Sequence, residues 1–143
     1  MIKNILIVKS VYYEDISKEL YKNALEIIED RKKNHYVTNT YSVPGVFEIP
    51  AVISKYIKAY YGVVALGCVI KGKTPHFDFI SKATTDAIMK LSIEHQKPIG
   101  NGIITCLNKK QALVRSKTKG QEAAKAVLSV LKSFDNPPEW KIH

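Results

Sequence analysis

Hydrophobic positions along the chain gather into short unbroken runs separated by runs with helical spacing. The segments NILIV and GVVALGCVI are almost entirely apolar, as is typical of strands that are covered on both faces. HYVTNTYSV is rich in β-branched and aromatic residues and ends at Pro44 and Gly45, a turn signal. IGNGIITC begins just after Pro98. The pattern predicts four strands, at 4–8, 35–43, 62–70 and 99–106.

Between these runs, apolar residues recur every three or four positions, as they do on the buried face of a helix. Ile16, Leu20, Ala24 and Ile27 mark the first such face, which follows two acidic residues that suit the amino end of a helix dipole. Further helices are expected at about 47–60, 108–115 and 119–134, and a long one is marked by Ile80, Ala83, Ala87 and Leu91.

The alternation of strand and helix predicts an α/β fold. Four parallel strands with helices on both faces would make a three-layer α/β/α sandwich of the flavodoxin-like kind. We expect one domain over residues 1–143, with an irregular tail at 136–143 because Pro137 and Pro138 cannot continue a helix. Right-handed crossovers bring the carboxyl ends of the strands to one edge, where such folds bind ligands.

Composition and charge narrow the function classes. The formal net charge is +9, but the lysines are scattered and no aromatic-basic or zinc-finger motif accompanies them, so we expect no nucleic-acid partner. No run reaches the roughly 20 apolar residues of a membrane span. Cys68 and Cys106 lie in apolar runs without metal-ligand spacing, and we interpret both as reduced core residues. That usage favours the cytoplasm.

The candidate chemistry lies just after the strands. The stretch GKTPHFDFI at 72–80 places a histidine where the third strand gives way to a helix. Thr74 can cap that helix, and Pro75 suits its first position because no amide hydrogen is needed there. His76 then lies in the first turn, beside backbone amides that can hold an anion approaching Gly72. The alternative is a capped helix whose first turn happens to contain a histidine.

Several segments together resemble the 6,7-dimethyl-8-ribityllumazine synthase family. The segments are VPGVFEIP, ALGCVIKGKTPHFDFI, and GNGIITC followed by QALVRS. Their order and spacing match the family from about Lys3 to Leu131, and the histidine and VPGVFEIP segments are specific when they occur together. The family's fold, a four-stranded parallel sheet flanked by helices, agrees with the pattern above.

The resemblance implies an enzyme of riboflavin biosynthesis. The family condenses 5-amino-6-(D-ribitylamino)uracil with 3,4-dihydroxy-2-butanone 4-phosphate through an imine, elimination of phosphate and ring closure. It implies two small-molecule substrates, one of them phosphorylated, and neither a metal nor an organic cofactor.

The resemblance also assigns roles to residues. His76 matches the proton-transfer histidine, and Arg115 matches the arginine that binds the substrate phosphate, together with Lys73 and Thr74. Tyr12 takes the place of the aromatic that stacks on the pyrimidine. The remaining binding positions are Val46, Phe47 and Glu48 for the ribityl chain and Cys68, Val69 and Ile70 for the pyrimidine.

The chain departs from the family at two places. Asn101 stands where many members have phenylalanine, and an asparagine cannot supply the same apolar wall to the pyrimidine pocket that the resemblance implies. The link SKTKG at 116–120 is short, whereas members that build icosahedral shells carry a glycine-rich kink there. The resemblance therefore implies a homopentamer in which Asn101 and Arg115 close the pocket of a neighbouring subunit.

Other interpretations stay open from sequence. Glu48 could simply begin a helix, and Arg115 could be a solvated cation at a helix end. Asp78 could orient the imidazole or only complement the helix dipole. A non-catalytic flavin- or lumazine-binding scaffold of the same fold is the alternative function, and a basic nucleic-acid-binding domain rests on charge alone.

Overall fold

Four parallel strands form the centre of the computed structural model, which describes residues 2–30, 32–33 and 35–139. The strands are β1 (Lys3–Ser10), β2 (Tyr36–Val43), β3 (Gly62–Ile70) and β4 (Ile99–Cys106). They lie in the order β2-β1-β3-β4, and every neighbouring pair is parallel. After β1 the chain adds β2 on one side, and then β3 and β4 on the other side. The direction of strand addition changes between β1 and β3, and this is the switch point of the sheet.

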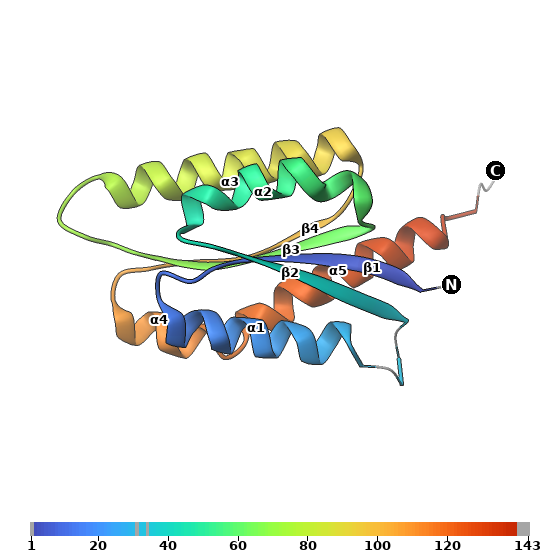
Figure 1. Ribbon diagram of the computed structural model, residues 1–143, viewed down its shortest axis with the longest axis horizontal. Coiled ribbons are helices and arrows are strands. Elements are labelled where there is room, and N and C mark those ends of the chain that lie inside the picture. Colours follow the sequence, from blue (N-terminus) through green and yellow to red (C-terminus); the bar gives the residue numbers. More distant parts are fainter. Residues whose placement is uncertain (1, 31, 34, 140–143) are drawn as a thin grey trace.

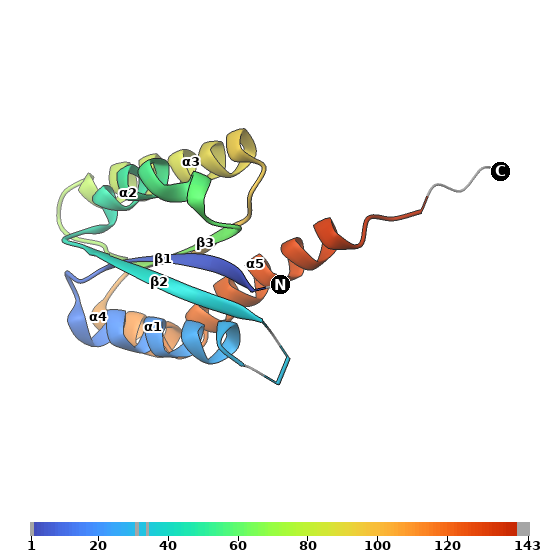
Figure 2. The same cartoon turned by 45° about the vertical axis from the view of Figure 1, so that its right-hand side comes forward.

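Helices cover both faces of the sheet, as the alternating pattern predicts (Figure 1). On one face lie α1 (Glu14–Ile28), α4 (Lys109–Arg115) and α5 (Lys119–Asp135). On the other face lie α2 (Ile49–Tyr56) and α3 (His76–His95). Figure 2 shows the three layers from a second direction, with the far end of α5 extending beyond the sheet. The predicted α/β/α sandwich is confirmed. None of the helices described could cross a membrane.

Each face of the sheet has its own hydrophobic core because successive strand residues point to opposite sides. In β1, Ile5 and Ile7 pack with α1 and α5, whereas Leu6 and Val8 pack with α2 and α3. All four side chains are fully buried. This double coverage explains why β1 and β3 are nearly continuous apolar runs in the sequence.

The predicted helix boundaries need two corrections. The stretch expected at 47–60 is a short α-helix, α2, between two 3-10 turns, Val46–Glu48 and Ile57–Ala59. Pro75 is the residue before α3 and not its first helical residue. The prediction was one position early because the carbonyl of Pro75 already accepts the first helical hydrogen bonds.

The buried face of α3 also differs from the prediction. Its fully buried residues are Thr84 and Ile88, and Ile80 and Leu91 pack beside them, whereas Ala83 is exposed. The apolar pattern counts threonine as a polar residue. The prediction therefore missed Thr84, which lies at the centre of the buried face. Of the expected tail, 136–139 contains neither helix nor strand, and 140–143 lie outside the described residues.

The link between α4 and α5 is a turn over 116–118 held by a buried asparagine of α1. Asn23 Nδ2 donates hydrogen bonds to the carbonyl oxygens of Ser116 at 3.2 Å and Lys117 at 3.0 Å. Gly120, in the first turn of α5, then packs so closely on α1 that a Cβ there would overlap the carbonyl oxygen of Leu20. The short link is thus fixed on both sides by α1.

Candidate functional site

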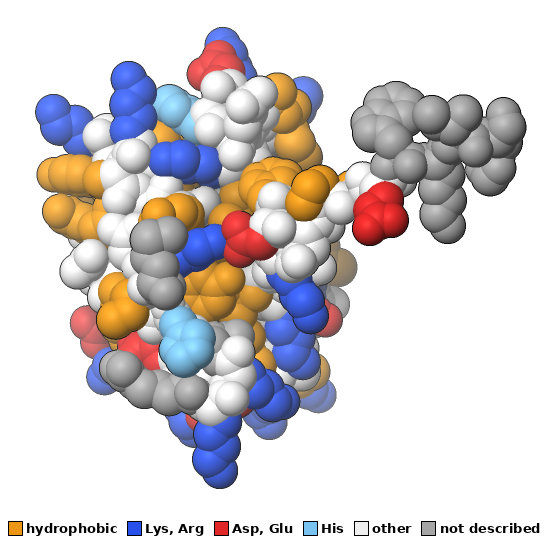
Figure 3. Space-filling model, turned by 90° about the vertical axis from the view of Figure 1, so that its right-hand side faces the viewer, with side chains coloured by type: hydrophobic (Ala, Val, Ile, Leu, Met, Phe, Trp, Pro, Cys, Tyr) orange, Lys and Arg blue, Asp and Glu red, His pale blue; other side chains and the backbone are white. Residues whose placement is uncertain are grey.

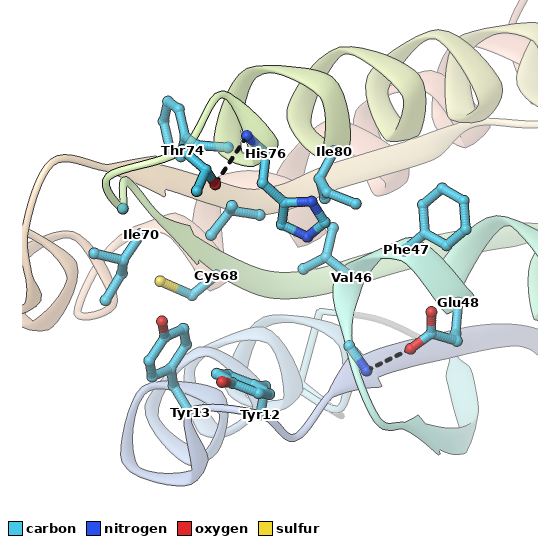
Figure 4. Close-up of a pocket in the computed structure, with 14 residues that line it drawn as sticks. Tyr12, Tyr13, Val46, Phe47, Glu48, Cys68, Ile70, Thr74, His76 and Ile80 are labelled. Atoms are coloured by element: carbon cyan, nitrogen blue, oxygen red, sulfur yellow. Dashed lines mark hydrogen bonds between the residues drawn. The ribbon is translucent and has the colours of Figure 1, made fainter.

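A pocket of about 420 Å³ opens at the switch point, where β1 and β3 end. This is the place at which open parallel sheets bind ligands. Segments from four parts of the chain enclose it, and Figure 4 shows their side chains converging. The lining residues are Tyr12, Tyr13, Gly45, Val46, Phe47, Glu48, Cys68, Val69, Ile70, Gly72, Thr74, His76, Phe77 and Ile80.

Two tyrosines between β1 and α1 form one wall. Tyr12 is 74 % exposed although it is aromatic, and Tyr13 meets it edge to face with ring centroids 4.9 Å apart. An aromatic face left open to a pocket is a surface on which a planar ligand can stack. Lys109 makes a cation–π contact with Tyr13, with its Nζ 5.4 Å from the ring centroid. The same Nζ forms an ion pair with Asp15 Oδ1 at 3.1 Å.

The turn after β2 forms the second wall. The Gly45 amide donates to Glu48 Oε1 at 3.0 Å, which closes the 3-10 turn on itself. Val46 is buried beneath this turn, whereas Phe47 is 62 % exposed. The turn therefore presents an apolar ring, backbone groups and a carboxylate with a second oxygen beside the pocket (Figure 4).

The end of β3 forms the floor. Cys68 is almost fully buried, and Val69 and Ile70 are half-buried as the strand leaves the core. Burial raises the pKa of the Cys68 thiol to about 12, so the side chain stays neutral near pH 7. Cys68 and Cys106 are both free and buried, as predicted. The Cys68 thiol is therefore an apolar wall and not a nucleophile.

The raised thiol pKa predicts a pH dependence of stability. Above about pH 8.5 an unfolded cysteine releases a proton that the folded chain keeps, so stability is intact below that pH and declines as pH rises toward 12. The melting temperature should fall above about pH 9, and less steeply in Cys68→Ala. Thermal melts of both proteins between neutral and alkaline pH check this. Parallel declines in the two proteins would assign the effect to other groups.

The turn before α3 carries the histidine. The prediction that Thr74 caps α3 is wrong, because Pro75 is the residue before the helix and no side-chain hydrogen bond among the described residues caps it. Thr74 Oγ1 only accepts a long local hydrogen bond, at 3.4 Å, from the His76 amide. The imidazole points from α3 into the pocket beside Val46 (Figure 4). No atom lies within 4 Å of a Cβ built on Gly72, so the approach to the turn is open. An anion placed there would face the amino end of a 20-residue helix.

Asp78 does not orient the imidazole in this structure. It is exposed in the first turn of α3, and its amide donates to the carbonyl oxygen of Pro75 at 3.2 Å. Within the described ranges, no hydrogen bond joins its carboxylate to His76. Of the two roles open from sequence, the position of Asp78 fits the helix-dipole role.

Three of the residues expected at the site lie outside this pocket. Lys73 is exposed in the turn before α3. Asn101 is exposed on β4, and its Oδ1 accepts the Ile103 amide at 3.1 Å. Arg115 ends α4, and its guanidinium donates to the carbonyl oxygen of Thr105 at 2.9 Å. Asn101 and Arg115 therefore belong to the β4 side of the sheet.

The pocket also includes residues that no motif assigned to it. Tyr13 follows Tyr12 directly and could have been found from its place after β1. Phe77 and Ile80 line the pocket from the first turns of α3, but in sequence Ile80 reads only as a core position. Gly45 and Gly72 contribute backbone at the two turns.

The arrangement suits a planar, polar organic ligand next to an anion. Aromatic and aliphatic walls can enclose a ring, while the Glu48 carboxylate and the backbone of the turns can bind its substituents. An imidazole within the same pocket can transfer protons near neutral pH. Among residues 2–30, 32–33 and 35–139, no group of three acidic, histidine or cysteine side chains could hold a metal ion. Fold and pocket thus define an α/β protein of flavodoxin-like topology with a histidine-lined pocket at the switch point.

Comparison with known proteins gives the family. The 6,7-dimethyl-8-ribityllumazine synthase family model matches residues 3–135. A protein of that name from Methylobacterium radiotolerans is 42% identical over 133 residues, which cover 89% of this chain and 79% of the relative. A protein of the same name from Bartonella bacilliformis is 40% identical over 136 residues, which cover 90% of this chain and 88% of that relative. The chain belongs to the 6,7-dimethyl-8-ribityllumazine synthase family.

Proposed function

We propose that this chain is a lumazine synthase. It condenses 5-amino-6-(D-ribitylamino)uracil with 3,4-dihydroxy-2-butanone 4-phosphate and yields 6,7-dimethyl-8-ribityllumazine, phosphate and water. One observation carries the proposal: the family's motif residues, far apart in sequence, line a single pocket at the switch point. They are Tyr12, Val46, Phe47, Glu48, Cys68, Val69, Ile70, Thr74 and His76.

The pyrimidine substrate takes the inner part of the pocket. Its ring stacks on Tyr12, and its polar edge meets backbone groups at the end of β3, Cys68 to Ile70. The ribityl chain runs along Val46 and Phe47 and binds Glu48. This division is supported by the exposed ring of Tyr12 and by the Glu48 carboxylate, which uses one oxygen in its own turn.

The phosphorylated substrate takes the turn before α3. Its phosphate sits at Lys73 and Thr74, near the amino end of α3, and its carbonyl carbon faces the amine of the pyrimidine. Imine formation, loss of phosphate and ring closure each move protons, and His76 is the group in the pocket that transfers them. Holding both substrates in one enclosure supplies proximity as well.

A second copy of the chain completes the site. No residue of β4 lines the pocket, although Asn101 and Thr105 are exposed on that strand. Asn101 and Arg115 of a neighbouring subunit would close the pocket, and the Arg115 guanidinium would donate hydrogen bonds to the substrate phosphate. Such a heterologous contact closes into a ring, and the short link after α4 favours a homopentamer. The two reduced cysteines suit a cytoplasmic location.

Turnover with both substrates tests the proposed function. The purified chain should release phosphate and form the lumazine in equal amounts, and omission of either substrate should stop both. A scaffold that only binds lumazine would bind the product without forming it, and this result would contradict the proposal. Light scattering on the same sample should give about five times the 16.1 kDa chain mass.

His76→Ala should lower turnover by about 100-fold or less. General acid–base groups contribute about 10² to 10⁴-fold, and this case falls at the low end because imine chemistry proceeds unaided once both substrates are held together. Steady-state kinetics on the folded variant measure the effect. His95→Ala, at the other end of α3, is the matched control and should retain wild-type turnover. Unchanged turnover in His76→Ala would remove the imidazole from the mechanism.

A further inference from the structure

A second hollow lies at the opposite end of the sheet, where β1 and β2 begin. It has a volume of about 650 Å³, within the range of small-molecule sites. An eight-residue strand spans roughly 25 Å, which separates this hollow from the lumazine pocket. Figure 3 views this end, where blue lysine side chains border an orange hydrophobic patch. The lining residues are Lys3, Lys33, His35, Tyr36, Lys125, Leu128, Ser129, Lys132 and Asp135.

The charge of this cationic hollow is unbalanced. Its single acid, Asp135, is already bound by Lys3 at 2.7 Å. Within the part of the chain that the structure describes, Lys33, Lys125 and Lys132 form no ion pair. Three ammonium groups gathered without a counter-charge repel one another, and a bound anion would relieve that repulsion.

The shape of the hollow selects the kind of anion. Lys125, Ser129 and Lys132 recur on one face of α5, and the two lysines stand about 10 Å apart along the helix axis. Between the charged positions, Tyr36 and Leu128 are half-buried and offer apolar surface. A ring can lie against that surface while a phosphate reaches the lysines and the Ser129 hydroxyl. Nucleic acid would be expected to follow an extended cationic stripe, whereas this site is concave.

We propose that the cationic hollow binds an organic phosphate of nucleotide size, a phosphate ester whose molecule also contains a flat ring. Its charge comes from the lysines of α5 and Lys33, and its apolar contact comes from Tyr36 and Leu128. The site is separate from the chemistry of lumazine formation, and no residue of the lumazine pocket lines it.

Adenosine 5′-monophosphate is the probe. Its binding to the full-length protein is measured by calorimetry in wild type, in Lys125→Glu/Lys132→Glu, and in Lys18→Glu/Lys22→Glu. The last pair carries the same change of charge on exposed α1 positions that line neither pocket. Lumazine formation is measured in all three proteins. It should be unchanged, which would show that the variants are correctly folded. Lys125→Gln/Lys132→Gln repeats the test without new charges.

The α5 variants should weaken binding of the probe by about tenfold or more, because each removes two charge-assisted contacts. The α1 control should stay within about twofold of wild type. Adenosine, which lacks the phosphate, should bind at least about tenfold more weakly than the monophosphate. Equal binding by wild type and the α5 variants would overturn the proposal and assign the probe to another site. Binding of a single-stranded oligonucleotide without binding of the monophosphate would overturn it in favour of a nucleic-acid surface.

Discussion

Replacing Arg115 by alanine should raise the Michaelis constant for the phosphorylated butanone by about 10- to 150-fold and leave that for the pyrimidine near wild type. A guanidinium–phosphate contact is charge-assisted, and its loss costs about 1.5–3 kcal/mol. The side chain is free to make this contact because it is exposed and uses only one end to bind the Thr105 carbonyl oxygen. Steady-state kinetics with each substrate varied in turn measure the two constants.

Two further variants sharpen this test. Lys110→Ala removes an exposed cation from the same helix and should change neither constant. Arg115→Lys keeps the charge but loses the planar fork, so it should restore only part of the affinity. Equal increases in both constants for Arg115→Ala would show that the guanidinium does not bind the phosphate.

Gly120→Ala, in the first turn of α5, should clearly destabilise the fold. The new methyl group would overlap the backbone of Leu20, which cannot move aside as a flexible side chain can. Overpacking of this kind costs about 1–3 kcal/mol, equivalent to a fall of roughly 3–10 °C in melting temperature for a chain of this size. Thermal unfolding followed by circular dichroism measures the change.

Gly72→Ala is the matched control for stability. A Cβ at Gly72 meets nothing within 4 Å, and no glycine in the described part of the chain has a positive φ. This substitution should leave the melting temperature unchanged or raise it slightly, because alanine restricts the unfolded chain. A fall as large as that in Gly120→Ala would mean that general sensitivity to glycine replacement, and not the contact with α1, causes the effect.

The strands could be predicted because both faces of the sheet are covered. Burial on two sides makes β3 a run of apolar residues from Val63 to Ile70, interrupted only by Gly67, and none of the helices in the described ranges has such a run. The α3 face was harder, because its centre is Thr84, whose buried hydroxyl has no hydrogen-bond partner within the described ranges. A hydropathy pattern does not register a polar residue of that kind.

The candidate site was predictable where a motif and a strand end coincide. Tyr12, Glu48 and His76 each follow a strand or its turn, so parallel topology brings them together. Arg115 and Asn101 follow β4 or lie within it, and the order β2-β1-β3-β4 puts that strand at the far edge. In the proposed function, Asn101 and Arg115 act in the pocket of a second copy, so their contribution depends on docking between chains and not on the fold of one chain.

The most direct test of the proposed site is a mixture of two impaired variants. His76→Ala and Arg115→Ala chains are unfolded together, refolded, and assayed against each variant refolded alone, at a concentration of the phosphorylated butanone below its wild-type Michaelis constant, where both variants are impaired. If the histidine of one subunit works with the arginine of its neighbour, roughly a quarter of the sites in randomly mixed rings carry both groups. Activity should then rise well above that of either parent, toward a quarter of the wild-type value. Activity no greater than the average of the two parents would contradict a site shared between subunits.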